Sequence, residues 1–177
     1  EIASCLVGSE MCIRDSVQAL QAGREWDGRQ GGKPGDKPGV VRGLAEPGLA
    51  ALDLGPQAPL QWVTGEQSNS SVIVGGQAIL KLLRNAHPGL SAEVEMTRHL
   101  TRAGYANIPA LLGEVQRVDA DGVPCTLAVL HAYIANEGDA WRWTLDYLKR
   151  TLASALLGGD SPQEFEASLE GLSLIHI

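Results

Sequence analysis

The chain has 177 residues, of which 20% are charged, and its formal net charge at pH 7 is −7. An acidic balance without basic clusters argues against a nucleic-acid partner and against a membrane-surface partner. No apolar run approaches the roughly 20 residues that a membrane span needs. These properties predict a soluble protein with neither kind of partner.

The two ends of the chain are explained by DNA rather than by protein structure. Residues 11–16 (MCIRDS) can be encoded as ATG TGT ATA AGA GAC AG, and the reverse complement of this DNA, read in another frame, encodes 172–177 (LSLIHI). The inverted sequence resembles a transposase adapter used for sequencing libraries. We therefore assign 1–16 and 172–177 to the adapter, exclude them from fold reasoning and expect them to make no packing contacts.

The remaining residues, 17–171, then read as an internal piece of a longer gene. They retain one of the three cysteines, Cys125. A single cysteine excludes an internal disulfide framework and suits a reducing, cytoplasmic compartment. Because Cys125 lies inside an apolar run, we expect a small buried hydrophobe rather than a nucleophile.

Before residue 60 the sequence patterns that indicate secondary structure are short. Residues 17–23 are typical of the last turns of a helix that stops at Gly23. Residues 28–39 are dense in Gly and Pro and predict a surface loop. Two short strands are expected at 39–44 and 49–54.

From residue 60 onward the pattern predicts an α+β domain. Three antiparallel strands are expected at 60–63, 70–74 and 77–83, with Gly75-Gly76 forming the second turn. A helix follows over 88–104, with Ser91 as a candidate N-cap, and then a hairpin of 110–118 with 124–134. Further helices begin near Asp139 and at Ser161.

Lys81 lies in the third of these strands, between aliphatic residues. A charge on a partly buried strand is costly unless it is paired. The small ATP-binding lobe of kinase-like enzymes has the same order of elements: strands, a strand that carries a lysine, a helix that carries acidic residues, and a hairpin. In that lobe the lysine reaches the phosphates of ATP and a glutamate on the helix pairs with the lysine. Glu95 is the expected partner, and Glu93 is the weaker alternative.

Ordinary readings of the same residues remain open at this point. Lys81 would then be an edge lysine whose stem covers apolar surface, Glu95 a first-turn acid that favours the helix dipole, and 66–71 a polar turn. The histidines have neither the mutual spacing nor the neighbouring acids of a metal site. They are predicted to be structural or surface residues: His87, His99 and His131.

Five blocks together resemble the maltokinase family, whose members occur alone or fused behind a trehalose synthase domain. The blocks are GEQSNSSVIV (65–74), AILKLLR (78–84), EVEMTRHLTRAG (93–104), NIPALLGEV (107–115) and YIANEGDAW (133–141). The resemblance covers 63–148 and is looser over 17–62. It implies a two-lobed, aminoglycoside-phosphotransferase-like kinase that transfers the γ-phosphoryl group of ATP to maltose, giving maltose 1-phosphate for trehalose and α-glucan (glycogen) metabolism.

The resemblance also implies a division of the chain. Residues 17–59 would end an N-terminal cap, 60–135 would form the ATP-binding small lobe (an antiparallel sheet plus one packed helix), and 136–171 would begin a helical large lobe. The base aspartate, the Mg²⁺ ligands and the sugar-binding residues of the family belong to parts of the large lobe that this chain lacks. No catalytic residue or metal ligand is therefore expected here, and the chain alone should be inactive.

Within the small lobe, the resemblance implies three groups of nucleotide-binding residues. Lys81 would hold the phosphates and be oriented by Glu95, a polar loop would cover the phosphates, and the backbone of a hinge at 130–134 would bind adenine. These residues are Ser68, Asn69, Ser70, Ser71, Lys81, Glu95, Ala132 and Ile134.

Two alternatives stay open. Every matched motif serves ATP and none touches the acceptor, so a related sugar or amino-sugar kinase, for instance one acting on glucosamine, is the nearest alternative. A kinase-derived binding module without catalysis is the alternative of a different class.

Overall fold

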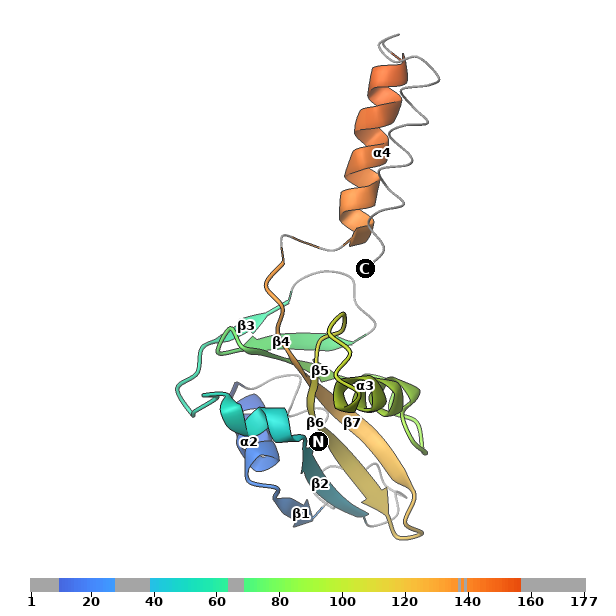
Figure 1. Ribbon diagram of the computed structural model, residues 1–177. Coiled ribbons are helices and arrows are strands. Elements are labelled where there is room, and N and C mark those ends of the chain that lie inside the picture. Colours follow the sequence, from blue (N-terminus) through green and yellow to red (C-terminus); the bar gives the residue numbers. More distant parts are fainter. Residues whose placement is uncertain (1–9, 28–38, 64–68, 137, 139, 157–177) are drawn as a thin grey trace. The chain divides into compact units, whose positions relative to one another are not determined.

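The computed structural model describes residues 10–27, 39–63, 69–136, 138 and 140–156 (Figure 1). It divides the chain into two compact units, 1–134 and 135–177. Within the described ranges no helix combines the length and the apolar character needed to cross a membrane.

The first unit is built on a seven-stranded sheet with the order β1-β2-β6-β7-β5-β4-β3. Every neighbouring pair of strands is antiparallel. The expected α+β class, an antiparallel sheet with a packed helix, is confirmed. The strands are β1 (Glu25–Asp27), β2 (Gly39–Ala45), β3 (Leu60–Trp62), β4 (Ser70–Val74), β5 (Ala78–Leu82), β6 (Leu111–Asp119) and β7 (Pro124–Ala132).

The turns between these strands follow from local chemistry. Gly75 and Gly76 both adopt positive φ, at 62° and 65°, as a tight two-residue hairpin requires. The β6–β7 turn contains Gly122 at φ 81°, and the Asp119 carboxylate accepts hydrogen bonds from the N–H groups of Asp121 and Val123. Both predicted hairpins are confirmed.

One face of the sheet carries the main core. Val72, Leu80, Ala128 and Leu130 point to this face at alternating strand positions and are fully buried. The helix α2 (Glu10–Gln21) and the 3₁₀ helix η1 (Pro47–Ala51) supply further core residues to it; in Figure 1 they lie to the left of the sheet and α3 lies to its right.

Two expectations about these covering elements were wrong. The strand predicted at 49–54 is replaced by η1, because Pro47 at the helix start has a preset φ and no N–H to donate to a strand partner. The expectation that 1–16 makes no packing contacts fails at Ile13, which is 0% exposed in the same core cluster as Val72 and Leu80. Ile13 stands four residues before Val17 and so extends the apolar stripe of α2 by one turn. Residues 1–9 and 172–177 lie outside the described residues.

The opposite face of the sheet is covered by α3 (Ala92–Arg102). Val94 of this helix packs on Leu111 and Val129 in a small second cluster. Ser91 occupies the predicted N-cap position with extended backbone but makes no side-chain capping hydrogen bond. Gly104, at φ 72°, ends the helical segment as predicted.

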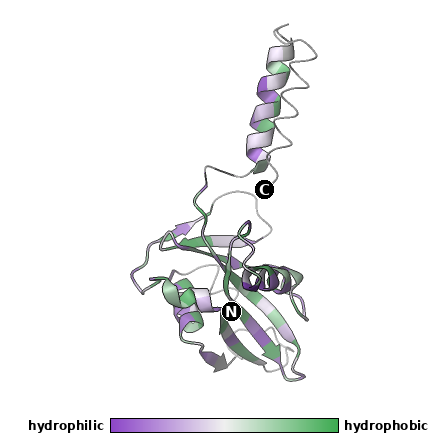
Figure 2. Cartoon of the chain, viewed as in Figure 1, coloured by the Kyte–Doolittle hydropathy of each residue, from purple (hydrophilic) through white to green (hydrophobic). Residues whose placement is uncertain are grey.

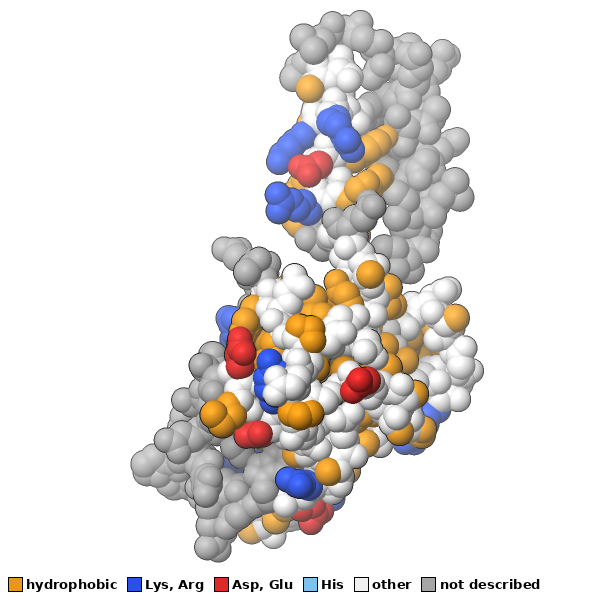
Figure 3. All heavy atoms as spheres, turned by 90° about the vertical axis from the view of Figure 1, so that its left-hand side faces the viewer, with side chains coloured by type: hydrophobic (Ala, Val, Ile, Leu, Met, Phe, Trp, Pro, Cys, Tyr) orange, Lys and Arg blue, Asp and Glu red, His pale blue; other side chains and the backbone are white. Residues whose placement is uncertain are grey.

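The second unit contains α4 (Ala140–Leu156). Hydrophilic and hydrophobic residues alternate along it (Figure 2), and its charged side chains gather on one side (Figure 3). The rings of Trp143 and Tyr147 stack with their centroids 5.6 Å apart. The predicted N-cap Asp139 and the helix predicted from Ser161 lie outside the described residues.

Candidate functional site

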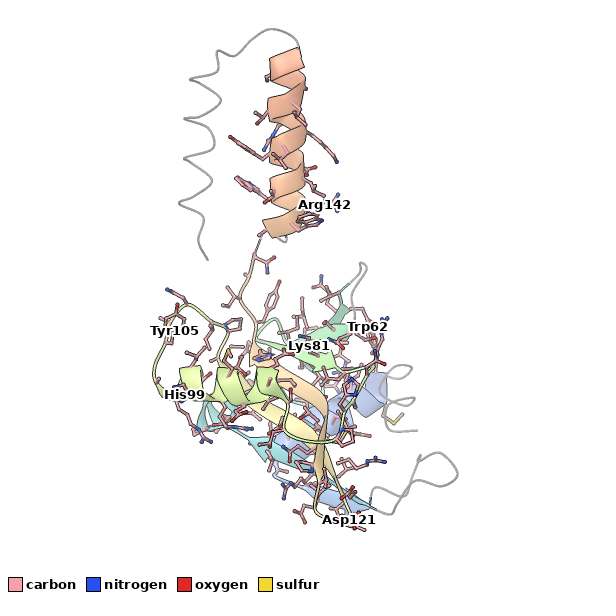
Figure 4. All side chains as sticks on the ribbon, turned by 90° about the vertical axis from the view of Figure 1, so that its right-hand side faces the viewer. Trp62, Lys81, His99, Tyr105, Asp121 and Arg142 are labelled. Carbon is pink, nitrogen blue, oxygen red and sulfur yellow. The ribbon has the colours of Figure 1, made fainter. Side chains whose placement is uncertain are left out.

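The candidate site lies on the α3 face of the sheet and centres on Lys81. Its ammonium nitrogen Nζ lies 2.8 Å from Oε1 of Glu93, and both side chains are only partly exposed, at 32% and 37%. In Figure 4, Lys81 lies near the beginning of α3, whereas His99 lies toward its far end. A strand lysine and a helix glutamate are therefore paired, as the sequence predicted, but through the alternative glutamate.

Glu95, the expected partner, is exposed. Each helical residue turns by about 100°, so Glu93 and Glu95 flank the sheet-facing Val94 on opposite sides. The Glu95 side also carries Arg98, which contacts β6, whereas the Glu93 side faces β5. The prediction of Glu95 was wrong because the choice depends on which strands flank the helix axis, and spacing alone does not reveal this.

The predicted phosphate loop is divided between the two faces of the sheet. Ser71 is the direct cross-strand partner of Lys81, so the two side chains share a face, and Ser71 is buried. Ser70 points to the other face, where its hydroxyl accepts a hydrogen bond from Arg84. Asn69 precedes β4 directly, and Ser68 lies outside the described residues.

The predicted hinge at 130–134 comprises the last three residues of β7 and the two residues after it. The N–H of Ala132 donates to the carbonyl of Ala110, and the N–H of Tyr133 donates to the carbonyl of Gln77, each at 2.8 Å. The N–H of Ala132 is therefore already engaged within the sheet and is not available to a base. Ile134, two residues further on, is exposed.

His131, which the sequence analysis predicted to be a structural or surface residue, lies close to the Lys81–Glu93 pair. It is paired with Ile79 on β5 and with Leu111 on β6, which places it on the Lys81 face, and it is buried. Burial lowers the pKa of its imidazole; the nearby Glu93 carboxylate acts to raise that pKa and the Lys81 ammonium to lower it. The period-two spacing from Val129 was the signal that could have placed His131 beside the lysine.

The arrangement offers an ammonium group held by a carboxylate and a serine hydroxyl beside it on one face of an antiparallel sheet. These groups suit a ligand with anionic and hydrogen-bonding parts. Among the described residues no group of three or more His, Cys, Asp or Glu side chains is placed to hold a metal ion.

Comparison with known proteins identifies structural likeness but no family. No family model matches the chain. A solved structure titled "Glucosamine kinase (crystal form B)" is similar at 26% identity with a TM-score of 0.45, and the match covers 78% of this chain and 30% of that chain. "Glucosamine kinase in complex with glucosamine, ADP and inorganic phosphate" is similar at 22% identity with a TM-score of 0.46, covering 78% of this chain and 28% of that chain. The chain thus spans less than a third of the solved chains that it resembles.

Proposed function

We propose that residues 60–135 form the ATP-binding small lobe of an ATP-dependent sugar kinase. The observation that carries the proposal is the 2.8 Å pair of Lys81 and Glu93, formed between the strand after a hairpin and the helix that follows it. The buried Ser71 directly opposite Lys81 supports the same role.

In this role Lys81 binds the α- and β-phosphates and stabilises the charge that shifts during phosphoryl transfer. Glu93 keeps the ammonium group aimed at the phosphates, because a charge-assisted hydrogen bond is stronger and more directional than a neutral one. In kinases Mg²⁺ neutralises charge on the phosphates; among the described residues no group of three or more His, Cys, Asp or Glu side chains is placed to hold it.

The groups described above serve the nucleotide, so the acceptor has to be assigned by experiment. The sequence blocks resemble maltokinases and favour maltose, whereas the titles of the similar structures name glucosamine. Both sugars therefore belong in the test, and the non-catalytic binding module is the outcome in which neither is phosphorylated.

Nucleotide binding can be tested on the chain as it stands. The chain has four lysines, so ¹³C-dimethylation gives few NMR signals, and a Lys81→Arg chain assigns the signal of Lys81. Added ATP should shift the Lys81 signal and leave the Lys149 signal in place. Equal shifts for both signals, or none, would exclude Lys81 from a nucleotide site.

The acceptor can be tested with the protein from an uninterrupted gene. ATP consumption in the presence of maltose, and separately of glucosamine, assigns the substrate directly. Turnover of glucosamine alone would keep the kinase proposal and replace maltose as the acceptor.

A further inference from the structure

A second group of charges lies on the same face of the sheet, between α3 and strands β2 and β6. Arg98 donates from Nε to Oε1 of Glu46 at 2.7 Å and from Nη2 to Oε1 of Glu114. Arg102 also pairs with Glu46, at 3.1 Å, and Thr126 donates its hydroxyl to Glu114. We call these residues the arginine network.

The carboxylates of this network are buried. Glu114 is 1% exposed and Glu46 is 7% exposed. A buried carboxylate is strongly destabilising when its partner is removed. The hydrogen bonds to both carboxylates outweigh the effect of burial and raise the pKa of Arg98, so the guanidinium stays charged and both acids are compensated.

The apolar attachment of α3 to the sheet is small by comparison. Val94 is the one helix residue in the cluster with Leu111 and Val129, and the Thr101 hydroxyl accepts a hydrogen bond from the N–H of Leu111. Val94 is the one buried residue of α3, so apolar burial does little to prevent rotation of the helix about its own axis. The arginine network supplies the directional contacts that prevent this.

The network and the Lys81 pair are connected through one row of the sheet. Lys81 on β5 and Glu114 on β6 are both cross-strand partners of Val129 on β7. The helix therefore lies across the row with Glu93 over β5, Val94 over β7 and Arg98 over β6. Rotating α3 about its axis would break the contacts at both flanks together.

We infer that Arg98 is a positioning residue for Lys81: by bridging Glu46 and Glu114 it fixes the rotation of α3, and this keeps Glu93 against the lysine. Glu46 lies just after β2, within residues that precede the proposed ATP-binding lobe. The network thereby links the preceding segment of the chain to the phosphate lysine. The value of this link for phosphate binding rests on the proposed function; the positioning itself does not.

The test is a double-mutant cycle between Lys81→Met and Glu93→Gln, repeated in three backgrounds of the 177-residue chain. These are the unmodified chain, Arg98→Lys and Arg42→Lys. Lysine cannot bridge two carboxylates as the guanidinium fork does. Arg42 is a matched control because it bonds Gln116 on β6 and lies on β2 rather than α3.

Two quantities are measured in each background, the unfolding equilibrium constant in urea and the dissociation constant for ATP. In the unmodified chain the Lys81–Glu93 coupling should change the unfolding constant by about two- to fivefold, as expected of a partly exposed pair, and Glu93→Gln should weaken ATP binding by about tenfold. With Arg98→Lys both effects should fall below about twofold, and with Arg42→Lys both should persist.

Each outcome decides the inference. If Arg98→Lys lowers stability but leaves the Lys81–Glu93 coupling intact, Arg98 is merely structural and the inference is overturned. Should Arg98→Lys fail to fold, Glu46→Gln replaces it, since this variant keeps the Arg98–Glu114 bond and should still reduce the coupling. If the unmodified chain binds no ATP, the proposed function fails, and the unfolding cycle still decides whether Arg98 positions Glu93.

Discussion

The pairing of Lys81 with Glu93 rather than Glu95 gives the sharpest prediction, because the two acids differ by two positions on one helix. Glu93→Gln removes the charge of a 2.8 Å ion pair while keeping the shape of the side chain. Since both partners are about one-third exposed, water screens the pair, and its loss should lower the free energy of unfolding by less than about 1 kcal/mol. Glu95→Gln, at an exposed position, should leave stability within about 0.5 kcal/mol.

The effect on nucleotide binding should be larger than the effect on folding. Without the Glu93 carboxylate the Lys81 ammonium is no longer held in one direction, and the loss of a charge-assisted hydrogen bond of about 1.5 kcal/mol corresponds to roughly tenfold weaker ATP binding. Titration of each variant with ATP, followed by NMR or calorimetry, measures this directly. Equal losses from Glu93→Gln and Glu95→Gln, or a loss only from Glu95→Gln, would refute the pairing.

Three further predictions follow from the same face of the sheet. Lys81→Ala in the protein from an uninterrupted gene should lower turnover by roughly 100-fold to 1000-fold with folding preserved; an unchanged rate would remove Lys81 from the phosphate site. Glu114→Ala should lower the free energy of unfolding by about 3 kcal/mol in urea titrations, because it removes one of the two buried carboxylates that Arg98 bridges, and a loss under about 1 kcal/mol would contradict the importance of the network. Burial lowers the pKa of His131 from the ordinary 6.5, so as the pH falls the unfolded chain takes up a proton at this histidine before the folded chain does, and the free energy of unfolding should decrease below about pH 6.5. His131→Asn should reduce this dependence of stability on pH. An unchanged dependence would show that another group titrates.

The parts of the fold that the sequence predicts are those fixed by local chemistry. Gly75-Gly76 determines its hairpin through positive φ, and Gly104 ends its helical segment in the same way. Apolar runs between turn residues predict the strands that contain Val72 and Leu80. The three-residue strand β1 was missed because it is too short to show a period.

The parts of the site that could not be predicted depend on contacts between distant residues. Arg98 meets Glu46, 52 residues away, and Glu114, 16 residues away. Sequence spacing gives the angle between Glu93 and Glu95 on the helix but not the direction in which either points relative to the sheet. The charge of Glu114 inside the apolar run LLGEV was the one local sign that a buried partner must exist.

The packing of α2 against the sheet can be tested by a matched pair of substitutions, whatever the origin of its first codons. Ile13 is fully buried, whereas Met11 on the same helix is 69% exposed. Ile13→Ala should lower the free energy of unfolding by about 2 to 4 kcal/mol, as loss of a buried aliphatic side chain does, while Met11→Ala should change it by less than about 0.5 kcal/mol. Equal, small effects in urea titrations would mean that the turn before Val17 contributes nothing, in agreement with an adapter origin of those codons. A large effect of Ile13→Ala is compatible with that origin too, because any apolar residue four positions before Val17 extends the same stripe, and the uninterrupted gene should then encode an apolar residue at that position.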